Sequence, residues 1–379
     1  MGAIKLYKNI VRRGASIYSN LIKIVGSLYV SKSYKKLPPA HGEREWIQRW
    51  RQLVKHPTVN CYRKYAEVAD NPMDIIPEDL MNTIIQPILN PNIYRPYYLD
   101  KNSFDKIYGK ENLPLTIARR MGGNYLDADY EALDFSATIH HVLSKDIEAL
   151  IAKPSIDSYG GRNILLFNRG TDGLFRWNEN PQKTLTLELL DELLGENWIL
   201  QKKMKQHQFM AQFNETSVNT FRVHVFTSPF TQKTDIAGIC MRVGAKGNWF
   251  DNIHSGGFCV SVDTEIGILG NIACDGRGNL TKNTQNNDFN QKFKVPNFDK
   301  LKEFAIQMGK KAVHHHSLAT DIMMCEDGSF RLIEINIGTF DANMYAATGK
   351  TPFGKYTDEV IEYCKDRKKK INFVHVIPW

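Results

Sequence analysis

The chain of 379 residues predicts an α+β fold. From about residue 97 onward, short apolar runs of strand length mix with short helical patterns, without the regular β-α-β alternation of a parallel sheet. Residues 1–95 show mostly helical patterns. The length is sufficient for two or three domains around a large core, and the composition is that of an ordinary globular protein.

Residues 1–42 carry eight basic side chains and no acidic one, which equals the whole net charge of +8. Apolar residues are interleaved among these charges, as is typical of an amphipathic segment. Such a segment either packs on the protein with solvated lysines or lies on an anionic membrane surface through residues 1–36. Because the charge is confined to one segment, we expect no nucleic-acid partner. The basic residues are Lys5, Lys8, Arg12, Arg13, Lys23, Lys32, Lys35 and Lys36.

The next part of the chain predicts helices interrupted by turns. Trp46, Trp50 and Leu53 follow one another at helical spacing within residues 43–54. Asp100 can cap a helix that opens at Phe104. Between these two places, turns are predicted at five prolines: Pro72, Pro77, Pro87, Pro91 and Pro96.

Short strands and two helices are predicted after residue 148. The strands are 149–153, 163–167, 198–201, 218–227 and 236–243, and the helices are 185–194 and 301–313. The first two strands flank a loop with Gly160 and Gly161, and Lys153 ends the first of them. Backbone amides of such a loop can lie over phosphates that the lysine also reaches, whereas the alternative is a plain hairpin turn.

Residues 321–336 predict a β-hairpin closed by the two-residue turn Asp327-Gly328. That turn would place Cys325 opposite Phe330 and Asp321 opposite Glu334, with Cβ atoms roughly 5 Å apart. Asn336 shares the face of Glu334. Facing carboxylates repel unless a cation lies between them, and three oxygen ligands suit Mg²⁺. The alternative is a solvated hairpin with acidic residues near its ends.

Polar residues also gather on strand 218–227. Alternation places Thr220, Arg222 and His224 on one face, where an arginine suits a phosphate or a carboxylate. The alternative is a solvated strand face. Residues 250–257 predict a loop whose glycines let the backbone approach something closely. Three consecutive histidines at 314–316 cannot all point at one ion, so we expect no metal there.

The six cysteines are scattered without a Cys-x-x-Cys pair, so we expect neither disulfides nor structural zinc. No apolar run is long enough to span a bilayer, and Lys23 breaks the apolar stretch that a signal peptide would need. We therefore expect a cytoplasmic protein, peripheral at the inner face of the membrane if residues 1–36 contact it.

Several of these motifs follow one another in a known order. The order is Asp100-Lys101, Lys153-Pro154 with its glycine loop, residues 199–204 and Asp321 with Glu334-x-Asn336. It resembles the ATP-grasp superfamily. Within that superfamily, residues 217–222, Asp251-Asn252 and 255–257 resemble the sugar-transfer-associated ATP-grasp family. The resemblance covers roughly residues 97–350 and implies two α+β subdomains that clamp a nucleotide.

The resemblance also implies ATP and two Mg²⁺ ions as ligands. The ions would be held by Asp321, Glu334 and Asn336. The remaining residues implied in nucleotide binding are Lys101, Lys153, Ser158, Gly160, Gly161 and Arg162 at the phosphates, and Gln201, Lys203 and Met204 at the adenine.

Two positions depart from the pattern of related peptide ligases. Ala319 stands where those ligases carry an arginine two residues before the metal aspartate. Gln201 stands where they carry an acidic residue, so the ribose contact is unassigned. Arg222 and Arg242 are the candidates for neutralising the transferred phosphate or the acyl phosphate.

The expected function is that of an ATP-dependent carboxylate–amine ligase, which forms an amide through an acyl phosphate. The family resemblance suggests an amino acid or amine joined to a sugar carboxylate in surface polysaccharide biosynthesis. Expected partners are therefore a small-molecule carboxylate and an amine, one of them a sugar or glycolipid. The alternatives are a kinase that phosphorylates a sugar or small-molecule hydroxyl, and a non-catalytic membrane-associated scaffold of polysaccharide assembly.

Three regions are expected along the chain. Residues 1–96 form a helical, basic N-terminal extension, and residues 97–352 form the ATP-grasp region. The latter divides into a lead-in at 97–148, a nucleotide-clamping subdomain at 149–210 and a metal and substrate subdomain at 211–352. A C-terminal helix and tail occupy 353–379.

Overall fold

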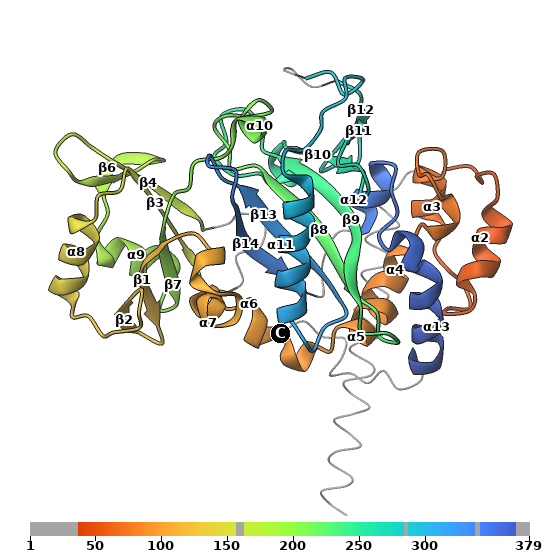
Figure 1. Ribbon diagram of the computed structural model, residues 1–379, viewed down its shortest axis with the longest axis horizontal. Coiled ribbons are helices and arrows are strands. Elements are labelled where there is room, and N and C mark those ends of the chain that lie inside the picture. Colours follow the sequence, from red (N-terminus) through yellow and green to blue (C-terminus); the bar gives the residue numbers. More distant parts are fainter. Residues whose placement is uncertain (1–36, 157–162, 284–286, 338–341, 369–379) are drawn as a thin grey trace, which may run out of the picture.

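The computed structural model describes residues 37–156, 163–283, 287–337 and 342–368. In this part of the chain the strands form two seven-stranded sheets with antiparallel neighbours. Figure 1 shows the first sheet at one end of the molecule, the second sheet in the middle and the N-terminal helices at the other end. This mixture of helices and antiparallel sheets confirms the predicted α+β class.

The first sheet has the strand order β2-β1-β7-β3-β4-β5-β6. Helices α8 (Phe135–Ser144) and α9 (Leu187–Leu194) pack on it. The Thr186 side chain caps α9 by accepting from the Leu189 N–H group, so the predicted helix starts two residues later than expected. The strands are β1 (Thr116–Met121), β2 (Asn124–Asp127), β3 (Ala149–Pro154), β4 (Leu165–Arg169), β5 (Phe175–Trp177), β6 (Asn180–Thr184) and β7 (Trp198–Lys202).

The second sheet has the strand order β12-β11-β10-β9-β8-β13-β14. Helix α11 (Phe298–Lys311) crosses one of its faces (Figure 1). The helix approaches β8 closely because residue 309 is a glycine: a Cβ atom there would lie 2.5 Å from Cγ1 of Val225. The strands are β8 (Thr220–Thr227), β9 (Thr234–Val243), β10 (Phe258–Val262), β11 (Leu269–Asp275), β12 (Leu280–Thr281), β13 (Ser317–Met324) and β14 (Phe330–Asn336).

The other face of the second sheet is covered at one end by helices from both ends of the chain. Trp46 and Trp50 are fully buried there, in a core that also contains Phe226 and Cys240 of the sheet. The helices of this layer are α2 (Glu43–Trp50), α3 (Asn60–Tyr65), α4 (Glu78–Leu80), α5 (Gln86–Leu89), α12 (Ala342–Ala347) and α13 (Thr357–Arg367). Short 3₁₀ turns accompany them at η1 (Pro72–Asp74), η3 (Asn92–Tyr94), η7 (Ile253–Ser255) and η8 (Gly354–Tyr356), and α10 (Gln208–Ala211) follows β7.

The prediction of a turn at Pro87 is wrong. Helix α4 continues through a π-helical segment, η2 (Met81–Ile85), directly into α5. Pro87 lies in the first turn of α5 and has no N–H group to donate. The wider π turn just before it accommodates this missing hydrogen bond, so the helix does not end.

A connector of short helices joins the two sheets. It consists of α6 (Arg95–Leu99), η4 (Lys101–Ser103), α7 (Phe104–Tyr108) and η5 (Lys110–Asn112). Phe104 and Tyr108 are buried in the core of the second sheet. Asn102 instead donates its side-chain amide to the carbonyl of Arg120 in the first sheet, at 2.9 Å. A helix opens at Phe104 as predicted, but Asp100 caps the 3₁₀ turn η4 directly before it, and α7 itself has no side-chain cap.

The hairpin of β13 and β14 places Asp321 opposite Glu334, as predicted, but by a different route. The N–H group of Cys325 donates to the carbonyl of Ser329, so Cys325 does not face Phe330. The turn holds three residues and ends with Gly328 in the left-handed region, at a φ of 78°. A register shift between Asp321 and Ile322, where Leu332 faces Ile322, then restores the expected pairing.

All six cysteines lie in the described part of the chain, are buried and form no disulfide. In the same part, no helix has the length and apolar character needed to cross a bilayer. The predictions for the basic segment 1–36 and for the tail beyond residue 368 lie outside the described residues.

Candidate active site

A cavity of about 330 Å³ lies between the two sheets. Strands β3 and β7 supply one wall, and β8, β9, β13 and β14 supply the other. Of the residues predicted for the site, nine line this cavity: Lys153, Gln201, Lys203, Met204, Arg222, Arg242, Asp321, Glu334 and Asn336. Strands that are far apart in the sequence thus bring the predicted residues together.

The wall from the first sheet carries Lys153 and the segment that follows β7. Lys153 is 7% exposed, and burial lowers its pKa to about 7, with a smaller contribution from Lys101. Burial also lowers the pKa of Lys203. The amide of Gln201 donates to the carbonyl of Pro114 and to the Thr116 hydroxyl, at 3.4 Å each, so it fixes the wall where related ligases carry an acidic residue.

The wall from the second sheet carries two arginines that share one carboxylate. Arg222 of β8 lies directly beside Asp321 of β13 and donates to both of its oxygens through Nε and Nη2, at 2.8 Å each. Arg242 of β9 donates through Nη1 to Asp321 at 2.9 Å and through Nη2 to Asp251 at 2.7 Å. Thr220 donates its hydroxyl to Asp251. These bonds form one continuous charged network across strands β8, β9 and β13 and the loop that carries Asp251.

The two carboxylates of this network titrate differently. Burial alone would raise the pKa of Asp321, but Arg222 and Arg242 outweigh it and hold the pKa at about 2. Burial raises the pKa of Asp251 above its usual value, because Arg242 compensates only in part and Asp321 adds repulsion. Asp321 is therefore a firmly ionised anchor for both guanidinium groups.

Lys101 crosses from the connector to the second sheet. Its Nζ atom lies 3.0 Å from Oε1 of Glu334, and its side chain is 6% exposed, whereas that of Glu334 is 32% exposed. Lys101 is also close enough to Lys153 to contribute to the lowered pKa of that residue. Lys101 therefore does not itself line the cavity, but it lies beside it through its pair with Glu334, whereas Lys153 is part of the lining.

The three predicted metal ligands lie together, but the cations nearest to them belong to the protein. Asp321 accepts from Arg222, Arg242 and the amide of Asn336, the last at 3.3 Å, while Glu334 pairs with Lys101. Glu334 and Asn336 line the cavity and are partly exposed, so their oxygens suit Mg²⁺. Asp321 would reach an ion only by exchanging one of its guanidinium contacts. No group of three His, Cys, Asp or Glu side chains suited to a metal occurs among the described residues.

Ala319 explains why the arginines come from neighbouring strands. Its side chain is fully buried in the same core as Met344 and Tyr345, between His224 and Asn336 on the adjacent strands. An arginine at this position would have to enter that packed core. Guanidinium groups reach Asp321 from β8 and β9 instead.

Some predicted or suspected residues do not line the cavity. His224 bonds to Ser317 and to the carbonyl of Pro352, and burial lowers its pKa to about 4. His314 stacks on Tyr94 with ring centroids 4.0 Å apart. Ser158, Gly160, Gly161 and Arg162 lie outside the described residues.

The site also contains the loop of residues 244–257, whose role the sequence predicted only in part. Trp249, Phe250, Asp251, Asn252 and His254 of this loop line the cavity. Its end glycines allow tight folding: a Cβ atom at Gly257 would lie 2.4 Å from the carbonyl oxygen of Val243. The glycines of residues 250–257 were the signal in the sequence, but nothing there predicted that Asp251 would bond to Arg242.

The chain is similar to solved structures of an ATP-grasp ligase and of a D-Ala:D-Ser ligase. No curated protein sequence matches the chain. A solved structure of the ATP-grasp ligase PsnB, with precursor peptide PsnA2 and AMPPNP, is 12% identical over 73% of this chain and 62% of its own, with a TM-score of 0.41. The VanG D-Ala:D-Ser ligase from Enterococcus faecalis is 10% identical over 70% of this chain and 61% of its own, with a TM-score of 0.40. The chain therefore spans about three fifths of the length of these two structures.

The sequence itself also matches a protein family. The match runs over residues 80–350, which is most of the chain and includes every described residue that lines the cavity. This family is the sugar-transfer associated ATP-grasp family, so the predicted resemblance is confirmed. The expected enzyme class, an ATP-dependent ligase of ATP-grasp type, agrees with this assignment. The chain belongs to the sugar-transfer associated ATP-grasp family.

Proposed function

We propose that the protein is an ATP-dependent ligase that joins a carboxylate to an amine through an acyl phosphate. The observation that carries this proposal is a set of cationic side chains at one cavity: Lys153, Arg222 and Arg242 line it, and Lys101 pairs with Glu334 of its lining. Such a set suits phosphoryl transfer, in which the protein supplies positioning and charge neutralisation. The described lining includes no serine or cysteine that could serve as a covalent nucleophile.

The two walls have separate tasks in this proposal. Lys101 and Lys153 bind the phosphates of ATP, while Gln201, Lys203 and Met204 hold its adenine. Glu334 and Asn336, with Asp321 behind them, would hold Mg²⁺. When bound, the ion supplies further neutralisation of the phosphate oxygens. The loop with Ser158, Gly160, Gly161 and Arg162 lies outside the described residues and stays a predicted cover for the phosphates.

Arg222 and Arg242 serve the group being transferred. The substrate carboxylate attacks the γ-phosphorus of ATP, the bond to ADP breaks and an acyl phosphate forms. The amine then attacks the acyl carbon, loses a proton and displaces inorganic phosphate. Both guanidinium groups are held in place by Asp321, so they meet the developing negative charge without reorganising.

The acceptor in this proposal is a sugar carboxylate of surface polysaccharide biosynthesis, and the donor of nitrogen is an amino acid or amine. The family description, sugar-transfer associated, supports this substrate class. Trp249 and Phe250 offer flat apolar surfaces and Asn252 and His254 offer hydrogen bonds, a combination that suits a sugar ring. Contact of residues 1–36 with an anionic membrane would bring the enzyme to lipid-linked sugars, in the cytoplasm.

Hydroxylamine trapping tests the proposed reaction. The protein is incubated with Mg-ATP and a panel of sugar acids and amino acids, with hydroxylamine in place of the amine. A ligase releases ADP and forms a hydroxamate, because hydroxylamine intercepts the acyl phosphate. A stable phosphorylated product that forms without any amine identifies a kinase instead, and the absence of nucleotide binding leaves only the scaffold.

A further inference from the structure

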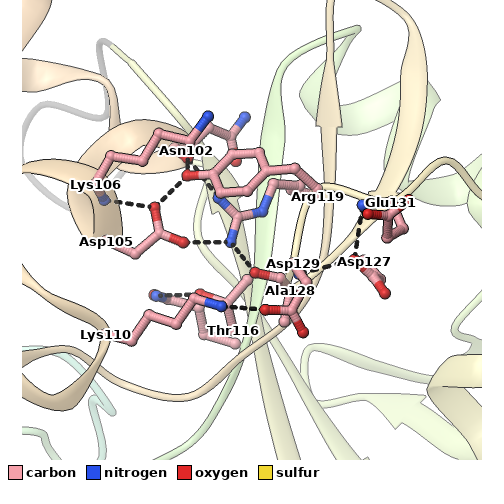
Figure 2. Close-up of polar contacts among 12 residues, drawn as sticks. Asn102, Asp105, Lys106, Lys110, Thr116, Arg119, Asp127, Ala128, Asp129 and Glu131 are labelled. Atoms are coloured by element: carbon pink, nitrogen blue, oxygen red, sulfur yellow. Dashed lines mark hydrogen bonds and ion pairs between the residues drawn. The ribbon is translucent and has the colours of Figure 1, made fainter.

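A buried cluster around Arg119 lies between the first sheet and the connector that carries Lys101. Figure 2 shows the guanidinium of Arg119 pointing at Asn102, Asp105 and Ala128. Arg119 is 1% exposed. Its Nη1 atom donates to the carbonyl of Asn102 at 2.5 Å, and Nη2 donates to Asp105 at 2.9 Å and to the carbonyl of Ala128 at 3.2 Å. One arginine of β1 therefore fixes both η4 and α7.

Tyr130 completes the cluster in an unusual conformation. Its φ is 70°, a left-handed value that bulky residues rarely adopt and that persists only where the surroundings hold it. The hydroxyl donates to the carbonyl of Asn102 at 2.8 Å and to Asp105. The ring lies under the guanidinium carbon of Arg119, which is 3.9 Å from the ring centroid. The strained residue and the buried arginine thus converge on the same carbonyl group.

That carbonyl belongs to the residue directly after Lys101. The backbone of Lys101 is held from the other side too, because its N–H group donates to the carbonyl of Ser155 at 2.9 Å. The side chain of Asn102 adds the bond to Arg120. The backbone N–H of Lys101 and the next residue, Asn102, are therefore both tied to the first sheet or the residue directly after β3, although Nζ of Lys101 reaches Glu334 in the second sheet.

We propose that Arg119, with Asp105 and Tyr130, is a positioning residue that holds Lys101 for the phosphates of the nucleotide. A lysine side chain has four flexible bonds, so its ammonium is well placed only if its backbone is fixed. The cluster supplies that fixation and ties the backbone of Lys101 to the same sheet that carries Lys153. This inference rests on the proposed ATP site.

A double-mutant cycle separates positioning from a merely structural role. Mg-ATP affinity is measured by calorimetry for the full chain and for Tyr130→Phe, Arg119→Gln and Lys101→Ala, alone and combined. We expect Lys101→Ala to weaken binding about tenfold, and Tyr130→Phe about threefold, through loss of its two hydroxyl bonds. In the Lys101→Ala background, neither second substitution should weaken binding further, because the residue through which both act is gone.

The control is Lys110→Ala, which removes the exposed ion pair with Asp129 beside the cluster (Figure 2) and should leave affinity unchanged. Losses that add up in the double variants, or unchanged affinity with a lowered unfolding temperature, overturn the positioning role. Tyr130→Phe keeps the test decisive if Arg119→Gln does not fold. If the wild type binds no Mg-ATP, the proposed function fails; if only Lys101→Ala weakens binding, the inference alone fails.

Discussion

If Lys153 contacts the phosphates of ATP as proposed, nucleotide affinity should depend on pH. The buried amine has a pKa of about 7 without nucleotide, because burial and then Lys101 disfavour its charged form. Phosphates placed beside it favour the charged form, so the pKa in the complex is higher. Binding therefore takes up a proton, and affinity falls as the pH rises through about 7.

The size of this effect follows from the pKa of about 7. Roughly nine tenths of the free sites carry a charged lysine at about pH 6, and roughly one tenth at about pH 8. If only the charged form binds phosphate, the association constant falls about tenfold over this range, which is about 1.4 kcal/mol. No such fall is expected from an arginine at the same position, because its charge persists throughout.

Isothermal titration of Mg-ATP at several pH values, in buffers of different ionisation enthalpy, measures both the affinity and the proton uptake. Lys153→Arg is the matched control. Titration of ATP itself affects both proteins equally, so the ratio of their affinities isolates Lys153. In Lys101→Met, the midpoint should move above 7, since a repelling charge is removed. Equal pH profiles for the wild type and Lys153→Arg would refute the reasoning.

Three further predictions concern stability. Asp321→Ala should lower the free energy of unfolding by about 3 kcal/mol or more, because two buried guanidinium groups lose their shared acceptor. Glu334→Gln should lower it by under about 1 kcal/mol, because the pair of Glu334 with Lys101 is partly exposed. Equal losses for the two variants in urea titrations would contradict this difference. Because its pKa is lowered, Asp321 contributes stability above pH 4 that is lost as the pH falls toward about 2, and an acid-unfolding midpoint unchanged in Asp321→Asn would count against it. Gly309→Ala should lower the free energy of unfolding by about 1–3 kcal/mol, because the added Cβ atom clashes with Val225. Adding Val225→Ala should relieve part of this loss. Losses that simply add in the double variant, measured by thermal unfolding, would disprove the close approach of α11 to β8.

The pairing of Asp321 with Glu334 shows how far the sequence alone could predict the site. Strand alternation and the Asp-Gly signal predicted the correct partners. Two local features were missed, the three-residue turn and the register shift between Leu332 and Glu334, and their effects on the register cancel. Turn length and bulges depend on local backbone energies that the hydrophobic pattern does not encode.

The polar network was only partly predictable. Alternation predicted that Arg222 shares a face with Thr220, but not that its partner lies 99 residues away on the neighbouring strand. Magnesium ions were expected to offset the charges of Asp321 and Glu334. In the structure, Arg222 and Arg242 already pair with Asp321, and Lys101 pairs with Glu334. Strand order is a property of the whole fold, so no local pattern reveals it.

Arg119 had no signal in the sequence at all. An arginine in a short strand is usually exposed, and the burial of Arg119 follows from the packing of the connector against β1. The left-handed backbone of Tyr130 is equally invisible, because tyrosine rarely adopts that conformation. Residues of this kind become visible only when the tertiary structure is known.

The most direct test of the account is calorimetric titration of Mg-AMPPNP into the wild type, Lys101→Ala and Lys153→Met. We expect one nucleotide to bind per wild-type chain and each substitution to weaken binding about tenfold, because both lysines are proposed to contact the same phosphates. A wild-type protein that binds no nucleotide, or three proteins that bind it equally well, would contradict the account.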